Sequence, residues 1–284
     1  MTILHSDANC FYASVEMVEN PSLREQRIAV CGDTEQRHGI VLTANYPAKR
    51  AGVKTAMANW EARQKCPDLV MLPPRYDLYL KYSRLLRRIY QRHSAQVEPF
   101  GMDECWIGLP FEEEEAIDVA ESIRRTVREE TGLTVSIGVS FCKALAKLGS
   151  DMKKPDGLTV LNRGNFREKC WGLPVSELLY VGPRTTLKLY EMGITTIGAL
   201  AQAPTDLIQR RFGKNGLMVR AFARGEDLSP VAPNDFAPQI KSIGHGATCV
   251  CDLHDNYSVW LALYELAQDV GHRMISHEVK AGGA

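Results

Sequence analysis

Three acidic side chains have the chemistry and the placement needed to hold divalent metal ions: Asp7, Asp103 and Glu104. Asp7 ends the run TILHSD at residues 2–7, which we predict to be a short strand followed at once by a helix. A carboxylate at a strand end faces the crevice where α/β proteins bind ligands. The alternative is that Asp7 caps the N-terminus of that helix.

Asp103 and Glu104 follow the tip of a predicted hairpin, in which QVEPF and ECWIGL are joined by a tight turn at Gly101-Met102. Neighbouring side chains on a regular strand point in opposite directions, but at a turn two carboxylates can converge. The resulting repulsion is relieved by a divalent cation. An Asp-Glu pair by itself is more often a solvated turn. Combined with an Asp at a strand end, it resembles the carboxylate cluster that holds two Mg²⁺ ions for phosphoryl or nucleotidyl transfer.

The elements that must position these residues alternate between strand and helix over residues 1–165, which predicts an α/β layer. Further strands are expected in RIAVCGD and GIVLTANY, which share a Gly/Asp-containing connection, and in DLVMLPP and LTVSIGVS. Helices are expected in FYASVEMVEN, PAKRAGV, MANWEARQKC, residues 76–93 and residues 114–131.

From about residue 166 the pattern changes to short helices, which predicts a small all-helical domain. These segments are NFREKCWGL, RTTLKLYEM, TIGALAQA, TDLIQRRFG and NGLMVRAFARG. The Pro-rich stretch APNDFAPQ is typical of a linker. IKSIGHGATCVCDL, at residues 240–253, has the pattern of one strand, and a helix is predicted at about 256–276. Because a lone strand has no pairing partner, we expect this C-terminal domain to be cut short.

Composition excludes several classes of protein. The chain has 284 residues and is 45% hydrophobic, so it can bury a core. Its formal net charge of zero does not by itself indicate a nucleic-acid-binding protein. It contains no apolar run long enough for a membrane span and no signal peptide. Its eight cysteines show neither zinc nor disulfide spacing, which indicates reduced thiols and a cytoplasmic location. The basic residues of KYSRLLRRIYQRH are best explained as a solvated helix face, and Glu112–Glu115 as acids at the positive end of a helix.

Five motifs in order carry a family resemblance: HSDANCFYASVE, LTANYPAKRAGVK, FGMDECWIGL, TVSIGVSFCKALAKLGSDMKKPDGL and VGPRTTLKLYEMGI. Over residues 2–280 the chain resembles the Y-family, or lesion-bypass, DNA polymerases. The resemblance implies an α/β (α+β) palm with fingers, a small all-α helix-hairpin-helix thumb and an incomplete C-terminal α/β little-finger domain. The implied boundaries are palm 1–20 and 74–165, fingers 21–73, thumb 166–232, linker 233–240 and partial little finger 241–284.

The same resemblance implies an activity and a cofactor. The activity is template-directed nucleotidyl transfer of low fidelity, as used in translesion synthesis. The implied cofactor is a pair of Mg²⁺ ions, with Mn²⁺ as a substitute. Their ligands would be Asp7, Asp103, Glu104 and the backbone carbonyl of Ala8.

The resemblance also implies substrate contacts. Nucleotide contacts are expected at Phe11, Tyr12, Ala13, Thr43, Tyr46, Lys49, Arg50, Asp151 and Lys154. Among these, Tyr12 would clash with a ribose 2′-hydroxyl. Lys49 stands where many members have Arg, which keeps the charge but loses bidentate geometry. Primer–template DNA is expected at the helix–hairpin–helix, which grips a phosphate through backbone N–H groups. Its implied contacts are Gly182, Arg184, Thr185 and Lys188. A plain helical hairpin is the alternative.

Several positions depart from the family pattern, namely Asn9, Gly101-Met102, Cys142 and Tyr180. They leave a second hypothesis open, a catalytically silent DNA-binding or scaffold relative, which a primer-extension assay would distinguish from a polymerase. The expected partners are primer–template DNA, a deoxynucleoside triphosphate and, through a C-terminal tail beyond this sequence, a sliding clamp. No membrane partner is expected.

Overall fold

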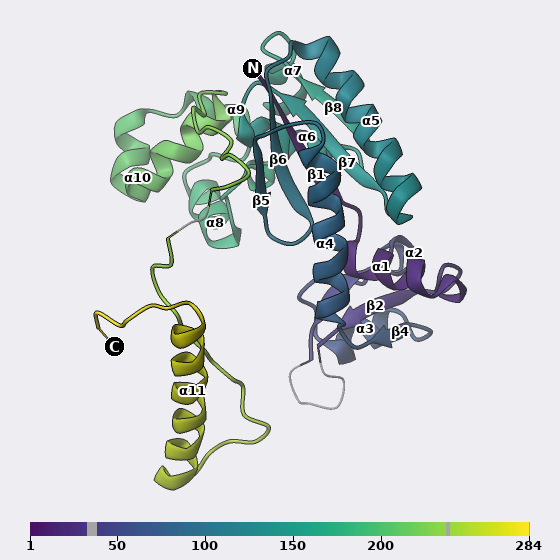
Figure 1. Ribbon diagram of the computed structural model, residues 1–284. Coiled ribbons are helices and arrows are strands. Elements are labelled where there is room, and N and C mark those ends of the chain that lie inside the picture. The colour runs from purple at the N-terminus through teal and green to yellow at the C-terminus, as the bar shows by residue number, and fades with distance from the viewer. Residues whose placement is uncertain (33–38, 237–238, 284) are drawn as a thin grey trace.

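A computed structural model describes residues 1–32, 39–236 and 239–283 (Figure 1). Its larger sheet has five strands in the order β5-β6-β1-β7-β8. The bounds are β1 Thr2–Ala8, β5 Val97–Phe100, β6 Glu104–Leu109, β7 Val135–Ser140 and β8 Leu158–Leu161. The predicted first strand, hairpin and buried strand at 133–140 are thereby confirmed, whereas β8 was not predicted.

The central strand β1 is antiparallel to both β6 and β7, and all seven of its residues are buried. Its alternate side chains enter two different apolar clusters, because successive residues of a strand face opposite sides of the sheet. Leu4 packs with α4 (Tyr76–Gln91) and α5 (Glu113–Thr131), and Ile3 packs on the side of α6 (Lys143–Met152). The sheet therefore has helices on both faces.

Helix α6, which was not predicted as an element, lies unusually close to the sheet. A Cβ atom added at Gly138 of β7 would stand 1.9 Å from the backbone oxygen of Ala146. Such a contact is impossible, so only glycine allows this approach. The close packing fixes the helix that carries Lys147 against the sheet.

A second sheet has the order β3-β2-β4, and its core contains no residue from the larger sheet. Its elements are β2 Ile28–Cys31, β3 Val41–Ala44, β4 Val70–Leu72, α2 Tyr46–Arg50 and α3 Asn59–Lys65. They match the predicted strands and short helices of this region. The predicted Gly/Asp-containing connection between β2 and β3 falls largely on 33–38, outside the described residues. Between β1 of the larger sheet and β2 of the second sheet, the chain forms α1 (Phe11–Glu19), as predicted, and the short 3₁₀ helix η1 (Pro21–Leu23).

The following region is helical, as predicted, and has its own core. Its elements are α7 Phe166–Cys170, η2 Val175–Glu177, α8 Pro183–Glu191, α9 Ile197–Gln202 and α10 Thr205–Ala223. Within α10, Gly213 has a φ of 62° that breaks the helical geometry. The two helices predicted on either side of this glycine are therefore both present.

The C-terminal region corrects one prediction. The strand expected over 240–253 is wrong: none of its residues is in a strand, and none of the described strands pairs with it. Gly244 and Gly246 weaken strand formation further. The predicted helix is α11 (Asn256–Ser276), which buries none of its residues and stands apart from the rest of the chain in Figure 1. The coil before it runs back along α11, where Arg273 donates to the Gly244 carbonyl at 3.4 Å.

The palm, fingers, thumb and little-finger boundaries stay predictions.

Within the described residues, no helix is both long and apolar enough to span a membrane.

Candidate active site

The end of β1 and the β5–β6 hairpin are held together by backbone contacts. Asp7 is the register partner of Glu104, and the Ala8 N–H donates to the Asp103 carbonyl at 3.1 Å. Gly101 turns the hairpin with a φ of 83°, a conformation that favours glycine. Cys10, not Asp7, is the N-cap of α1. The capping alternative for Asp7 is therefore wrong, and its carboxylate is available for other partners.

These carboxylates open onto a cavity of about 350 Å³ between the end of the larger sheet and the β3–α2 region. Most of the predicted site residues line it: Asp7, Ala8, Phe11, Tyr12, Thr43, Lys49, Asp103, Glu104 and Lys154. Three lining residues, Cys10, Leu42 and Thr55, were not predicted. The sequence motifs thus converge on one place although they are up to about 150 residues apart.

Four predicted nucleotide contacts are not among the lining residues. Ala13 is fully buried in a cluster with Cys10, Leu23 and Ile28, so its side chain is not offered to a ligand. Tyr46 is half-buried, with the Lys49 ammonium 5.3 Å from its ring centre. Arg50 is exposed in the last turn of α2. Asp151 instead pairs with Lys147 and Lys154, each at 2.9 Å or less.

The ring of Tyr12 is held from beneath by aromatic packing. It stacks on Tyr79 with ring centres 4.4 Å apart, and its hydroxyl donates to the Met102 sulfur at 3.2 Å. Tyr79 is itself fixed, because its buried hydroxyl donates to Glu16 at 2.6 Å. A ring supported in this way presents a rigid wall to the cavity.

The three carboxylates differ in their electrostatic surroundings. Burial, with the charges of Asp7 and Glu104, raises the pKa of Asp103 to about 7. Asp7 and Glu104 are instead paired with cations: Lys147 Nζ lies 3.1 Å from an oxygen of each. Lys154 Nζ lies 2.8 Å from Asp7. Among the described residues, no cation forms an ion pair with Asp103, and the more distant Lys154 charge offsets the rise of its pKa only in part.

Lys147 was missed by the sequence analysis, together with two buried residues behind it. Ser150 donates its hydroxyl to the Lys147 carbonyl and lies 2.8 Å from His5 Nδ1. The other ring nitrogen of His5 lies 3.6 Å from Glu104 and has no hydrogen-bond partner. Burial, then the Lys147 charge, lowers the pKa of His5 to about 3, so the ring is neutral. The spacing of Lys147 and Asp151 on one helical face was the available signal.

Asn9, one of the departures from the family pattern, points away from the cavity. Its side-chain oxygen accepts from the Asp156 N–H at 2.8 Å and from the Thr134 hydroxyl at 3.0 Å. Its amide donates to Ser136 at 2.9 Å. Asn9 therefore fastens the loop that follows Lys154 to the sheet.

The donor atoms of the cavity are of the kind that binds divalent cations, although the side chains lie farther apart than they would around a bound ion. In the part of the chain that the structure describes, no three acidic, histidine or cysteine side chains converge closely enough to hold a metal ion. The donor set is nevertheless all hard oxygen. Burial, and then the charges of Asp7 and Glu104, raise the pKa of Asp103, and a cation bound beside it would relieve both effects.

The predicted DNA contacts lie on α8 and the turn before it. Gly182 is the N-cap of α8, and Thr185 and Lys188 line a cavity of about 650 Å³ that also includes Arg211. Tyr180 has a φ of 66°, the left-handed conformation that a glycine would adopt without strain. Tyr180 therefore holds this turn in a conformation that costs a non-glycine residue strain.

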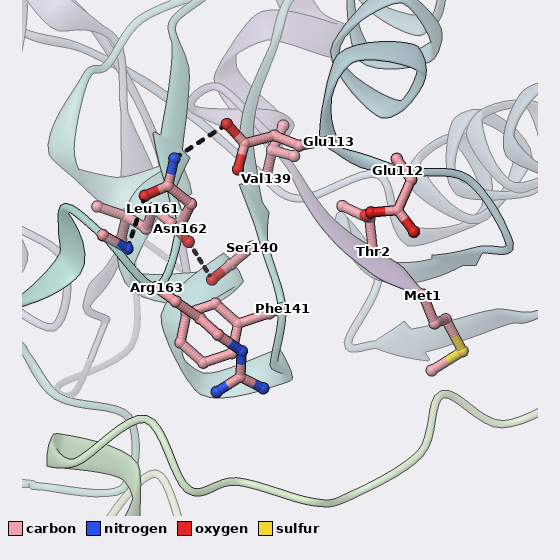
Figure 2. Close-up of a pocket in the computed structure, with 11 residues that line it drawn as sticks. Met1, Thr2, Glu112, Glu113, Val139, Ser140, Phe141, Leu161, Asn162 and Arg163 are labelled. Carbon is pink, nitrogen blue, oxygen red and sulfur yellow. Dashed lines mark hydrogen bonds between the residues drawn. The ribbon is translucent and has the colours of Figure 1, made fainter.

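A separate cavity of about 580 Å³ lies at the opposite end of β1 (Figure 2). Its wall includes Thr2, Ser140 and Arg163, and the Arg163 guanidinium stacks 4.3 Å from the Phe141 ring centre. Asn162 donates to Glu113 at 3.0 Å, as the dashed line in Figure 2 shows. None of the predicted site residues lines this cavity, so the site is assigned to the other end of the strand.

Comparison with known proteins gives consistent matches. The pattern of the impB/mucB/samB family matches residues 6–151. DNA polymerase IV of Acetivibrio thermocellus is 48% identical over 98% of this chain and 70% of its own length. DNA polymerase IV 1 of Bacillus subtilis is 39% identical over 98% of this chain and 68% of its own length.

Two solved structures extend the likeness to the fold. DinB from Sulfolobus solfataricus superposes with a TM-score of 0.75 at 27% identity, covering 81% of this chain and 69% of that one. The Y-family DNA polymerase chimera Dbh-Dpo4(243-245)-Dbh gives a TM-score of 0.86 at 26% identity, covering 96% of this chain and 80% of that one.

Proposed function

This chain belongs to the impB/mucB/samB family of Y-family DNA polymerases, and we propose that its cavity adds deoxynucleotides to a primer, with Asp7, Asp103 and Glu104 as the metal-binding carboxylates. Translesion synthesis is the activity that this family membership supports. The observation that carries the proposal is the convergence of these three carboxylates and Lys154 on one cavity.

Polymerases of this family use divalent metal ions, and we propose two Mg²⁺ ions here, replaceable by Mn²⁺. When bound, such ions lower the pKa of the primer 3′-hydroxyl and stabilise charge on the leaving pyrophosphate. Asp7, Asp103 and Glu104 would hold them, with the Ala8 carbonyl as a further oxygen ligand. The hard oxygen chemistry of this set supports Mg²⁺ over softer metals.

For the nucleotide, we propose that Lys154 and Lys49 bind the triphosphate, since both ammonium groups reach the cavity that contains the carboxylates. Tyr12 would exclude a ribose 2′-hydroxyl by steric clash, because Tyr79 prevents its ring from giving way. Phe11 and Thr43 would contact the sugar and the base pair. Tyr46, Arg50 and Asp151 would act from positions just outside the cavity wall.

For the other partners, we propose that primer–template DNA binds the turn before α8 through Gly182, Arg184, Thr185 and Lys188. We propose a sliding clamp as a further partner, which a C-terminal tail outside the sequence given would bind. The cytoplasm is the proposed location, where the eight free cysteines would remain reduced.

Primer extension with Mg²⁺ tests the proposal. Asp103→Ala should lower the extension rate by about 100-fold or more, because one of three charges that hold the metals is removed. Asp118→Ala, on the exposed face of α5, is the matched control and should extend primers at the parent rate. Near-parent extension by Asp103→Ala would refute the metal assignment.

The parent protein separates the two hypotheses about this fold, and a second variant tests the sugar gate. If the parent binds primer–template DNA but extends no primer, the silent scaffold is the correct alternative. If the parent is active, Tyr12→Ala should incorporate ribonucleotides, measured as the ratio of ribonucleotide to deoxynucleotide insertion. An unchanged ratio would place the sugar gate elsewhere.

A further inference from the structure

Lys147 is the least exposed cation of the site and contacts the most carboxylates. Its Nζ lies 3.1 Å from Asp7, 3.1 Å from Glu104 and 2.9 Å from Asp151, and only 14% of its side chain is exposed. Lys147 therefore places a positive charge within the carboxylate cluster.

Lys147 and Lys154 occupy different places although both contact Asp7. Lys154 lines the cavity, where an incoming anion can reach it. Lys147 is not among the lining residues and lies on α6, which the close approach at Gly138 fixes to the sheet. A ligand entering the cavity can therefore draw Lys154 away more easily than Lys147.

The Lys147 contacts also leave part of each carboxylate free. The ammonium contacts Asp7 through Oδ2 and Glu104 through Oε1. The second Glu104 oxygen faces the buried, unpaired nitrogen of His5 at 3.6 Å. Lys147 thus joins a residue of β1 to a residue of β6 while both keep oxygen atoms for another ligand.

We propose that Lys147 is a positioning residue that aligns Asp7 with Glu104 before any metal arrives and, by its charge, weakens the binding of free divalent ions to the cavity. This inference rests on the proposed function, in which these carboxylates hold the metals. Metal retention then depends on the triphosphate, whose negative charge offsets that of Lys147. The device would keep the metal-free site ordered and limit futile loading without a nucleotide.

The size of the effect follows from electrostatics. A unit positive charge a few ångströms from a divalent ion opposes its binding, and partial exposure of the site reduces that opposition. Removing the charge should therefore strengthen binding of a free divalent ion by about tenfold. If Lys147 acted through alignment alone, without an effect of its charge, its removal would weaken metal binding, because a disordered site holds metal less well.

The experiment measures Mn²⁺ binding to the full chain by electron paramagnetic resonance, without nucleotide or DNA. Lys147→Met keeps the length of the side chain without its charge and should bind Mn²⁺ about tenfold more tightly than the parent. Lys147→Arg should bind like the parent. Lys81→Met, which removes an exposed charge from α4, is the control for net charge and should also match the parent. In chelator, Lys147→Met should melt at a lower temperature, because Asp7 and Glu104 lose their counter-ion.

The outcomes separate this inference from the proposed function. Asp103→Ala should abolish the Mn²⁺ binding that the parent shows. If Asp103→Ala binds Mn²⁺ like the parent, the metal assignment itself fails. If Asp103→Ala behaves as expected but Lys147→Met binds Mn²⁺ equally or more weakly than the parent, the role of Lys147 is refuted. Lys147→Gln, which keeps polar contacts, repeats the test should Lys147→Met not fold. Failure of both variants to fold would also overturn the proposal, because Lys147 would then be needed for the fold itself.

Discussion

Strand β1 and the C-terminal residues 240–283 are opposite cases of how a segment is fixed in this molecule. All seven residues of β1 are buried, with a strand paired on each side and helices on both faces. Helix α11 is three times as long and buries none of its residues. The first segment is determined by its neighbours, and the second by its own helical hydrogen bonds and a few contacts with the coil before it.

This difference explains where the chemistry is placed. Two of the three metal-binding candidates, Asp7 and Glu104, are register partners on paired strands, so the sheet itself sets their separation. A site that must hold charged ligands in fixed geometry needs such rigid support. Residues 240–283 offer none, although they carry large exposed side chains such as Trp260 and Leu263.

The largest stability effect should come from Leu4→Ala in β1. Leu4 is fully buried in the main core, so the substitution removes apolar contacts and leaves a cavity. We expect a loss of about 3 kcal/mol in the free energy of unfolding, measured by urea denaturation. A loss below about 1 kcal/mol would show that the sheet around β1 can collapse onto the gap.

The sequence predicted most helices and strands because their signals are local. The helix predicted at about 256–276 is confirmed as α11, and the structure shows that Asp255 caps it by accepting from the Ser258 N–H. The strand at 240–253 failed for the converse reason: a strand forms only if a partner is present, and composition cannot supply one. Such errors are expected wherever pairing, and not propensity, decides the structure.

The candidate site shows the same limit. Motif resemblance identified nine residues that line the cavity, since these side chains stand at fixed positions in recognisable strings. It missed Lys147, whose importance arises from contacts with Asp7 and Glu104, 140 and 43 residues away in the chain. It also included Ala13, which the helix turns into the core. Contacts between distant segments had to come from the structure.

The carboxylate cluster should make the stability of the protein depend on pH. The pKa of Asp103 is raised to about 7 in the fold from an ordinary 3.8, so the folded protein holds a proton that the unfolded chain has lost between these values. Stability in chelator therefore falls as pH rises through this window. Asp103→Asn lacks this loss and should become more stable than the parent by about 1–2 kcal/mol at pH 8, with little difference at pH 4. Melting curves at several pH values measure this, and a pH-independent difference would contradict it.

The helical region is an intermediate case, with its own core but one strained position. Tyr180 has a positive φ of 66°, and 55% of its surface is exposed. Tyr180→Gly should relieve the backbone strain, whereas Tyr180→Ala removes the ring but leaves the backbone strained. We expect the glycine variant to be more stable than the alanine variant by about 1 kcal/mol in urea denaturation. Equal stabilities would mean that the backbone of this turn is not strained in solution.

The smallest effect should come from Leu263→Ala in α11, the counterpart of Leu4→Ala. Leu263 is 60% exposed, and alanine has a slightly higher helix propensity than leucine. The free energy of unfolding should therefore change by less than about 0.5 kcal/mol, in either direction. A loss above about 1 kcal/mol would mean that another surface covers this helix in solution. If that loss grew with protein concentration, the covering surface would belong to a second copy of the chain, because only an intermolecular contact depends on concentration. The contrast between β1 and residues 240–283 would then hold for the single chain but not for its assembly.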